Sequence, residues 1–242
     1  MIARLPGSKR DPDINAAKLS TSCIFAHWPV HPDAIREKVP SEFTLDVFDG
    51  TAWLAIVPFQ MTNVAPRGVP SLPWISAFAE LNVRTYVHVD DKPGIYFLSV
   101  DAASALAVRG ARILLNLPYY SARMNVSTDG PAIEYESRRH DDAVEATLLA
   151  KYSGVGSTYQ ADPGSLEYFL TERYCLYNLD HRRAPYRLDI HHPPWALQLA
   201  DAELSRNTMA DAAGVRLRDT KPLLHYSRRQ DMVAWPPCPL VR

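Results

Sequence analysis

The sequence predicts a mainly β fold of the α+β class, with many antiparallel strands and a few helices. Three observations carry this prediction. The segment Glu80–Val89 alternates strictly between apolar and polar residues, as a strand does. Twenty prolines recur through the 242 residues and favour many short elements over long helices. Regular alternation of strands and helices is absent, so we expect a closed or half-closed barrel, or two packed sheets, rather than a doubly wound sheet.

The composition excludes several other classes of protein. Hydrophobic residues make up 47% of the chain and charged residues 22%, which argues against disorder, collagen and coiled coil. The net charge of −1 gives no electrostatic reason to expect nucleic acid or a membrane surface as a partner. No apolar run reaches the roughly 18 residues of a membrane span. We therefore expect one domain over residues 1–242, with residues 1–18 as a peripheral lead-in.

The cysteines and histidines predict neither a disulfide framework nor a metal site. Three scattered cysteines are too few for a cysteine-based zinc site, and they fit a reducing, cytoplasmic location. The adjacent His191 and His192 would point to opposite faces of a strand, so they would not bind one metal ion together. The pair His27-Trp28 either lines the mouth of a pocket or packs in the core with its histidine hydrogen-bonded. No cofactor is expected.

The strand predicted at residues 80–89 has an apolar face that packs on a core and a polar face. The polar face carries Glu80, Asn82, Arg84, Tyr86 and His88. A rise of about 3.3 Å per residue places Glu80 about 13 Å from Arg84. The two side chains are therefore poorly placed to pair with each other, and each needs a different partner. For Arg84 the partner is a ligand carboxylate or another acidic residue. For Glu80 the candidates are Arg109, Arg112 and Arg123. Alternation alone leaves open whether this face meets solvent or a polar cavity.

A hairpin and a helix follow this strand. A turn at residues 90–94 leads into a nearly all-apolar strand at 94–101, which suggests a central position in a sheet. A helix rich in Ala and Leu is predicted over about 102–116, with Asp101 as its N-cap. Its polar residues share one stripe, so we expect the helix to be largely buried.

The remaining elements are mostly strands. Short helices are predicted at residues 164–171 and 205–213. Strands are predicted at 53–60, 119–126, 132–139, 144–153, 173–178, 186–191 and 223–234. Lys151 is the only lysine within a predicted core strand. Its face either lines a cavity, where burial would lower its pKa and allow imine chemistry, or meets solvent, as is more common.

Several motifs, in this order, resemble those of a known family. They are Asp46-Val47-Phe48-Asp49-Gly50-Thr51-Ala52-Trp53, Val57-Pro58-Phe59, Glu80-Leu81-Asn82-Val83-Arg84-Thr85-Tyr86, Leu117-Pro118-Tyr119-Tyr120 and Phe169-Leu170-Thr171-Glu172-Arg173-Tyr174. From about residue 20 to the C-terminus the chain resembles the YqjF-like family of uncharacterised conserved bacterial proteins. That family resembles acetoacetate decarboxylase in fold. The resemblance implies a cone-like, mostly antiparallel β-barrel with a ligand cavity and a few helices.

This sequence departs from the decarboxylase motif at the position of its lysine pair. Arg112 and Pro118 match the decarboxylase motif, but its lysine pair aligns with Tyr119 and Tyr120. Tyrosine has no amine and forms no imine, so acetoacetate decarboxylation by the family mechanism is expected to be absent. The alignment implies that Tyr119 points toward the cavity, and it favours an inward polar face for the strand at 80–89.

The sequence thus predicts a cytoplasmic protein that binds a small organic acid or carbonyl compound. Glu80 and Tyr119 are the candidate acid/base residues. The candidate ligand-binding residues are Arg84, Arg112, Tyr120, Asn82 and Tyr86. If the protein is an enzyme, lyase, isomerase or hydrolase chemistry without a covalent lysine is the expected class. The alternatives are a non-catalytic sensor or carrier, and an enzyme whose imine lysine has moved to Lys151. The expected partner is a small molecule, with no nucleic acid and no membrane, and the resemblance leaves a homo-oligomer open.

Overall fold

The structure, a computed structural model, describes residues 17–66, 77–140 and 144–240. Its helices are α1 (Pro32–Arg36), α2 (Ala105–Leu115), α3 (Leu166–Thr171) and α4 (Met209–Ala212). The first strands are β1 (Ala17–Val30), β2 (Thr44–Leu45), β3 (Ala52–Pro66), β4 (Phe78–Val89), β5 (Lys92–Ala102), β6 (Tyr119–Asp129) and β7 (Ala132–Arg139). The others are β8 (Thr147–Tyr159), β9 (Cys175–Leu179), β10 (Pro185–His191), β11 (Leu197–Asn207), β12 (Leu223–Ala234) and β13 (Cys238–Pro239). The predicted mainly β fold is confirmed.

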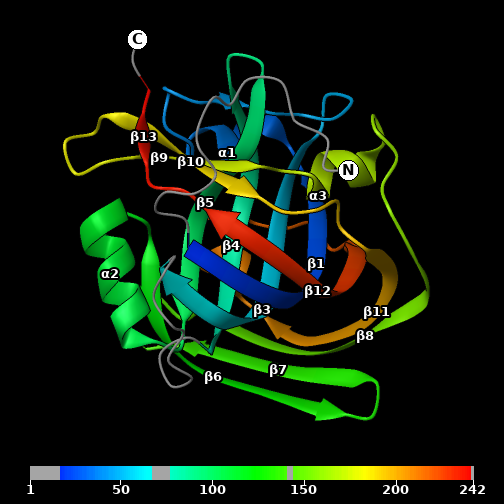
Figure 1. Cartoon of the computed structure of the whole chain (residues 1–242). Coiled ribbons are helices and arrows are strands. Elements are labelled where there is room, and N and C mark those ends of the chain that lie inside the picture. The colour runs from blue at the N-terminus through cyan, green and yellow to red at the C-terminus, as the bar shows by residue number, and fades with distance from the viewer. Residues whose placement is uncertain (1–16, 67–76, 141–143, 241–242) are drawn as a thin grey trace.

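Seven of the described strands pair in a closed ring. In order around the ring they are β1, β3, β4, β5, β9, β10 and β12, and β12 pairs back with β1. The pairing of β5 with β9, through Ile95 and Leu176, is parallel, and the others are antiparallel. Figure 1 shows β12, β1 and β3 running side by side across the front of the molecule.

A second layer covers one side of the ring. It consists of β6, β7, β8 and β11, and it joins the ring where β6 pairs with β5 and β11 pairs with β12. The apolar side chains of both layers form one core, to which the ring contributes Leu54, Ile56, Leu81 and Val83, and the second layer Leu148, Ala150 and Tyr152. This packing explains why Ala79, Leu81 and Val83 of β4 are apolar.

The even-numbered residues of β4 point into the ring. In the antiparallel register, Glu80, Asn82 and Arg84 lie opposite Phe59, Val57 and Ala55, which belong to the core inside the ring. Both faces of β4 are therefore buried, so the polar face does not meet solvent.

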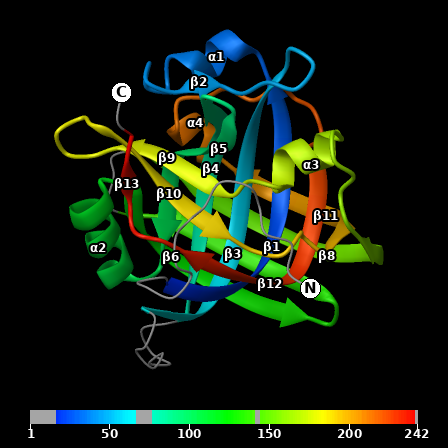
Figure 2. The same ribbon diagram turned by 45° about the horizontal axis from the view of Figure 1, so that its top comes forward.

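The prediction of a largely buried helix at about 102–116 is wrong in its burial, although a helix is present. In α2 only Val108 is buried, whereas Leu106 is 67% exposed and Leu114 78% exposed. Figures 1 and 2 both show α2 on the flank of the molecule. Its Ala and Leu content predicted a helix correctly, but composition does not state which face the rest of the fold covers. The N-cap is Ser104 rather than Asp101, because its Oγ accepts the backbone N–H of Ala107.

Most other predicted elements are present, and the exceptions have local reasons. The helix predicted at 205–213 is confined to α4 because residues 197–207 form β11, which pairs with β8. That segment contains helix-favouring Ala, Glu and Leu, so cross-strand pairing overrides its propensity. The strand at 17–30 was not predicted. The lead-in prediction, apart from residues 17 and 18 in β1, lies outside the described residues. Within the described ranges, no helix has the length and apolar character that crossing a membrane requires.

Candidate functional site

A polar cluster lies inside the ring, where a core of this size would ordinarily be apolar. Glu80, Asn82 and Arg84 come from β4 and are 3%, 4% and 8% exposed. Tyr119, the first residue of β6, enters the cluster because β6 pairs with β5 directly after α2 ends. Glu80, Asn82 and Arg84 thus lie along one buried face of β4, and Tyr119 contacts Glu80 near the start of that strand.

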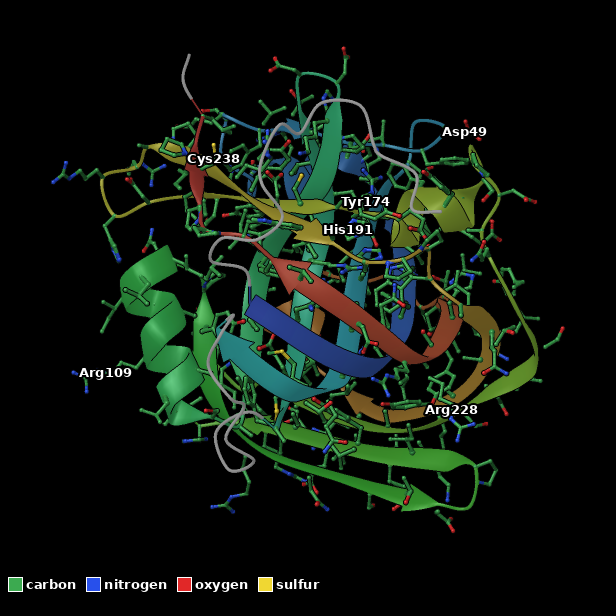
Figure 3. All side chains as sticks on the ribbon, viewed as in Figure 1. Asp49, Arg109, Tyr174, His191, Arg228 and Cys238 are labelled. Carbon is green, nitrogen blue, oxygen red and sulfur yellow. The ribbon has the colours of Figure 1, made fainter. Side chains whose placement is uncertain are left out.

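Glu80 and Tyr119 form the first part of this site. The Tyr119 hydroxyl donates a hydrogen bond of 3.0 Å to Oε2 of Glu80. None of the three arginines that were candidate partners pairs with Glu80 in the described structure, and Arg109 projects from α2 away from the body of the protein (Figure 3). Burial raises the pKa of Glu80 to about 8, against the opposing effect of the Tyr119 hydrogen bond.

A carboxyl group with this pKa holds its proton at neutral pH. It can donate a hydrogen bond or a proton to a bound group, which ionised carboxylates cannot do. Burial, together with the nearby Glu80, raises the pKa of Tyr119 well above its usual value, so its hydroxyl also stays protonated. The two side chains are thus uncharged; the Tyr119 hydroxyl donates to Glu80, and the protonated Glu80 is the donor that the pair can offer inside the ring.

The raised pKa of Glu80 predicts how the stability of the protein depends on pH. Between about pH 4.5 and pH 8 the folded state keeps this proton and the unfolded state releases it, so this contribution to stability falls as pH rises, by at most about 1.4 kcal/mol per unit. Glu80→Gln mimics the protonated form and is expected to match wild type near pH 5 and to exceed it near pH 8. Urea denaturation across this range measures the difference. Parallel curves for the two proteins would show that Glu80 is ionised normally.

Arg84 is the cationic part of the site and has no acidic partner. Its guanidinium carbon lies 5.4 Å from the ring centroid of Phe25 and 5.9 Å from that of Tyr86. Within residues 17–66, 77–140 and 144–240 no carboxylate pairs with it, and its Nε has no hydrogen-bond partner. A buried cation is costly without a counter-charge. This arrangement is typical of a site that receives an anion, and a guanidinium fits a carboxylate in particular.

The other predicted ligand-binding residues occupy different surroundings. Asn82 lies between Glu80 and Arg84 in the interior, and its Oδ1 has no hydrogen-bond partner. Tyr86 is fully buried, and its hydroxyl donates to the backbone oxygen of Leu170 at 2.9 Å. Asn82 thus offers a free polar atom to a ligand, and Tyr86 offers its ring.

Arg112 and Tyr120 lie apart from the interior cluster. Arg112 is exposed on α2, and its Nε donates to the backbone oxygen of Tyr119 at 2.6 Å. The ring of Tyr120 lies 3.8 Å from the guanidinium carbon of Arg139, which forms an ion pair with Asp101. Adjacent residues of a strand point to opposite faces. Tyr120 therefore points away from the interior into which Tyr119 points. The placement favours Arg84 over Arg112 as the residue that holds a carboxylate.

The structure contradicts the alternative of an imine lysine at Lys151. Its side chain is 45% exposed on β8, in the second layer, where Nζ lies 2.7 Å from Asp129 and 3.1 Å from Glu134. Hydrogen bonds to these carboxylates raise the pKa of Lys151, whereas imine chemistry needs a lowered pKa. The solvent-facing alternative is therefore correct for this residue.

Sequence reasoning missed part of the interior. His225 and Ser227, on β12, lie opposite Phe25 and Cys23 of β1 and face the same interior. His27 is fully buried there, so it does not lie at the mouth of a pocket. The signal that could have found His225 is its position two residues before Ser227 within a predicted strand, but pattern alone does not say that this strand closes a ring.

Comparison with known proteins gives one family and several structures of the same fold. Residues 20–231 match the model of the family DUF2071, described as an uncharacterised conserved protein. The protein YqjF of Bacillus subtilis (strain 168) is 48% identical over 213 residues, which cover 88% of this chain and 87% of YqjF.

The similar structures are related at low identity. An acetoacetate decarboxylase from Legionella pneumophila matches with a TM-score of 0.63 at 10% identity, over 98% of this chain and 92% of its own. An acetoacetate decarboxylase-like enzyme from Sphingomonas wittichii RW1 matches with a TM-score of 0.62 at 13% identity, over 98% and 96%. The enduracididine biosynthesis enzyme MppR, complexed with pyruvate, matches with a TM-score of 0.63 at 12% identity, over 98% and 93%. These likenesses show the fold alone.

Proposed function

This chain belongs to the DUF2071 family and has the fold of acetoacetate decarboxylase, and from that premise we propose that it binds a small organic acid inside its ring of strands. Arg84 holds the carboxylate of the ligand. Glu80 and Tyr119 contact a carbonyl or hydroxyl oxygen farther along the same ligand, which has to span the distance of about 13 Å from Arg84 to Glu80 along β4. Within the part of the chain that the structure describes, Cys23, Cys175 and Cys238 form no disulfide, which fits the cytoplasm, where we expect the protein to act.

The observation that carries the proposal is the buried guanidinium of Arg84 without an acidic partner. A ligand carboxylate would supply the missing counter-charge through two parallel hydrogen bonds. Asn82 offers a free Oδ1 beside it, which can accept a hydrogen bond from the ligand. The pyruvate in the structure of MppR, a protein of the same fold, supports a small carboxylate as the class of ligand.

The protonated Glu80 supports a catalytic use of the same site. A neutral carboxyl group with a pKa of about 8 can give its proton to an oxygen of the ligand and take it back in the same cycle. Lyase, isomerase or hydrolase chemistry on a small carbonyl or carboxylate compound is compatible with such a group. A covalent lysine intermediate has no place in the proposal, because the resemblance aligns the decarboxylase lysines with Tyr119 and Tyr120.

A thermal-shift screen of short carboxylates tests the proposal. A ligand present at 100 times its dissociation constant adds about 2.7 kcal/mol of stability. For a domain of this size the expected rise in Tm is about 5–10 °C. The matched primary amides serve as controls, because they keep the shape of each acid and lose its charge. Equal shifts for acids and amides would contradict a carboxylate site.

The alternative function is a sensor or carrier that binds without turnover, and Glu80→Gln and Tyr119→Phe distinguish the two. For an enzyme, we expect both substitutions to lower kcat, by about 10²–10⁴-fold for the acid/base residue Glu80. Because the Tyr119 hydrogen bond lowers the pKa of Glu80, Tyr119→Phe is also expected to move the pH profile upward. For a carrier, both variants change affinity and no product forms with any ligand found by the screen.

A further inference from the structure

Two buried histidines lie beside Arg84 and take no part in the site described so far. His27 on β1 and His225 on β12 have ring centroids 6.0 Å apart. The ring centroid of His27 is 5.9 Å from that of Phe25 and 6.3 Å from that of Tyr86, the same two rings over which the guanidinium of Arg84 lies. The histidine pair and Arg84 thus share one part of the interior.

The ring nitrogens of the pair are buried without normal hydrogen bonds. His27 and His225 are 0% and 1% exposed, and neither nitrogen of either ring has a hydrogen-bond partner of normal geometry, although backbone oxygens of Leu170 and Leu223 lie near His27. Ser227, two residues after His225, also has an unpartnered hydroxyl. Buried polar groups in native structures are almost always paired, so each exception calls for an explanation.

His192 shows how this fold treats a structural histidine. It is also buried, but its Nδ1 lies 2.8 Å from the backbone oxygen of Pro193 and 3.1 Å from Nε2 of Gln230. Its Nε2 lies 3.3 Å from the backbone oxygen of Arg173. Both ring nitrogens of His192 therefore have partners within the protein, whereas the ring nitrogens of His225 have none.

We infer that His27 and His225 bind a hydroxyl group next to the carboxylate that Arg84 holds, so that the ligand is a 2-hydroxy carboxylate or the enol form of a 2-oxo carboxylate. The inference rests on the proposed function, because it assigns a substituent to the same ligand. It adds two binding residues to the site and narrows the class of organic acid.

The hydrogen-bond donors and acceptors of the two histidines indicate this class of ligand. Burial lowers the pKa of both histidines, and for His27 the nearby charge of Arg84 and the neighbouring His225 act in the same direction. Glu167 has the opposite effect on His225, but burial is larger. Each neutral imidazole offers one N–H donor and one acceptor nitrogen. A keto oxygen only accepts and can therefore pair only with N–H donors of the two rings, whereas a hydroxyl can donate to the acceptor nitrogen of one histidine and accept the N–H of the other.

Stability of two phenylalanine variants tests whether His225 is kept for a ligand. His225→Phe removes two unpartnered nitrogens and keeps an aromatic ring, so we expect an unchanged or higher Tm. His192→Phe, the matched control, loses hydrogen bonds and is expected to lower Tm by several degrees. A loss of Tm in His225→Phe as large as that in His192→Phe would mean that His225 is structural and would overturn the inference.

Affinity for three acids with one carbon frame tests the hydroxyl group itself. Dissociation constants of propanoate, 2-hydroxypropanoate and 2-oxopropanoate are measured by NMR titration on wild type, His225→Phe and His27→Phe. We expect wild type to bind 2-hydroxypropanoate about 10-fold more tightly than propanoate, as one good buried hydrogen bond allows. Both variants should lose this preference and keep their affinity for propanoate.

The outcomes separate the inference from the proposed function. Equal affinities of wild type for 2-hydroxypropanoate and propanoate would overturn the hydroxyl subsite and leave the carboxylate site at Arg84 standing. A preference that survives in both variants would also overturn it. Absence of binding by all three acids would contradict the carboxylate site itself, and the inference would fail with it.

Discussion

Arg84→Met is expected to stabilise the folded protein while it removes the binding of carboxylates. Methionine fills a similar volume and makes apolar contacts with Phe25 and Tyr86, whereas the guanidinium is buried without an acidic partner. We expect the free energy of unfolding to rise by about 2 kcal/mol, within the range of gains found when an unfavourable functional group is removed. Urea denaturation in the absence of ligand measures this change.

Arg173→Met is the matched control for this prediction. Arg173 is also a buried arginine over the ring of Tyr86, at 5.0 Å, but its Nη1 pairs with Asp46 at 2.6 Å and its Nε donates to the backbone oxygen of Phe169. Its removal leaves these acceptors without their partner, so we expect a loss of about 3 kcal/mol. If both variants lose stability by similar amounts, Arg84 is a structural residue and the anion site is wrong.

Asp101→Asn is expected to cause the largest loss of stability, and it does so outside the ligand site. Asp101 and Arg139 are 0% and 1% exposed, with Oδ1 and Nη2 2.7 Å apart, and the Arg139 guanidinium also contacts the ring of Tyr120. Removing one charge of a buried pair leaves the other uncompensated, which costs about 3–5 kcal/mol. Chemical denaturation measures this loss, and carboxylate binding should persist wherever the variant remains folded.

A surface ion pair provides the comparison for Asp101→Asn. Glu136 pairs with Arg138 at 2.6 Å, and their side chains are 42% and 51% exposed. Because solvent screens this pair, Glu136→Gln is expected to change stability by less than about 1 kcal/mol. A comparably small loss in Asp101→Asn would contradict the large loss expected for the buried pair between β5 and β7.

The alternation of β4 determined much of what the sequence could predict. Strict alternation at residues 80–89 predicted both the strand and its polar face, and the ordered motifs pointed to the fold. The motif Leu117-Pro118-Tyr119-Tyr120 placed a tyrosine at the start of a strand, and the structure brings Tyr119 to Glu80. These predictions succeeded because they depend on local pattern, which the chain carries within a few residues.

The parts that could not be predicted depend on contacts between distant segments. The exposure of α2 follows from which side of the helix meets β5 and β6, and no periodicity within the helix contains that information. His225 enters the site only because β12 pairs with β1, a register that joins residues about 200 positions apart in the chain. The pKa of Glu80 likewise follows from burial by elements that are remote in sequence.

The central claim is that Arg84 makes the interior of the ring a site for small carboxylates. The most direct test is calorimetric titration of 2-hydroxypropanoate and its primary amide into wild type and Arg84→Met. The account predicts that wild type binds the acid at least about 10-fold more tightly than the amide, since a charge-assisted bidentate contact is worth more than 1.4 kcal/mol. Arg84→Met should bind the two alike. Equal binding of acid and amide by wild type, or an undiminished preference for the acid in Arg84→Met, would contradict it.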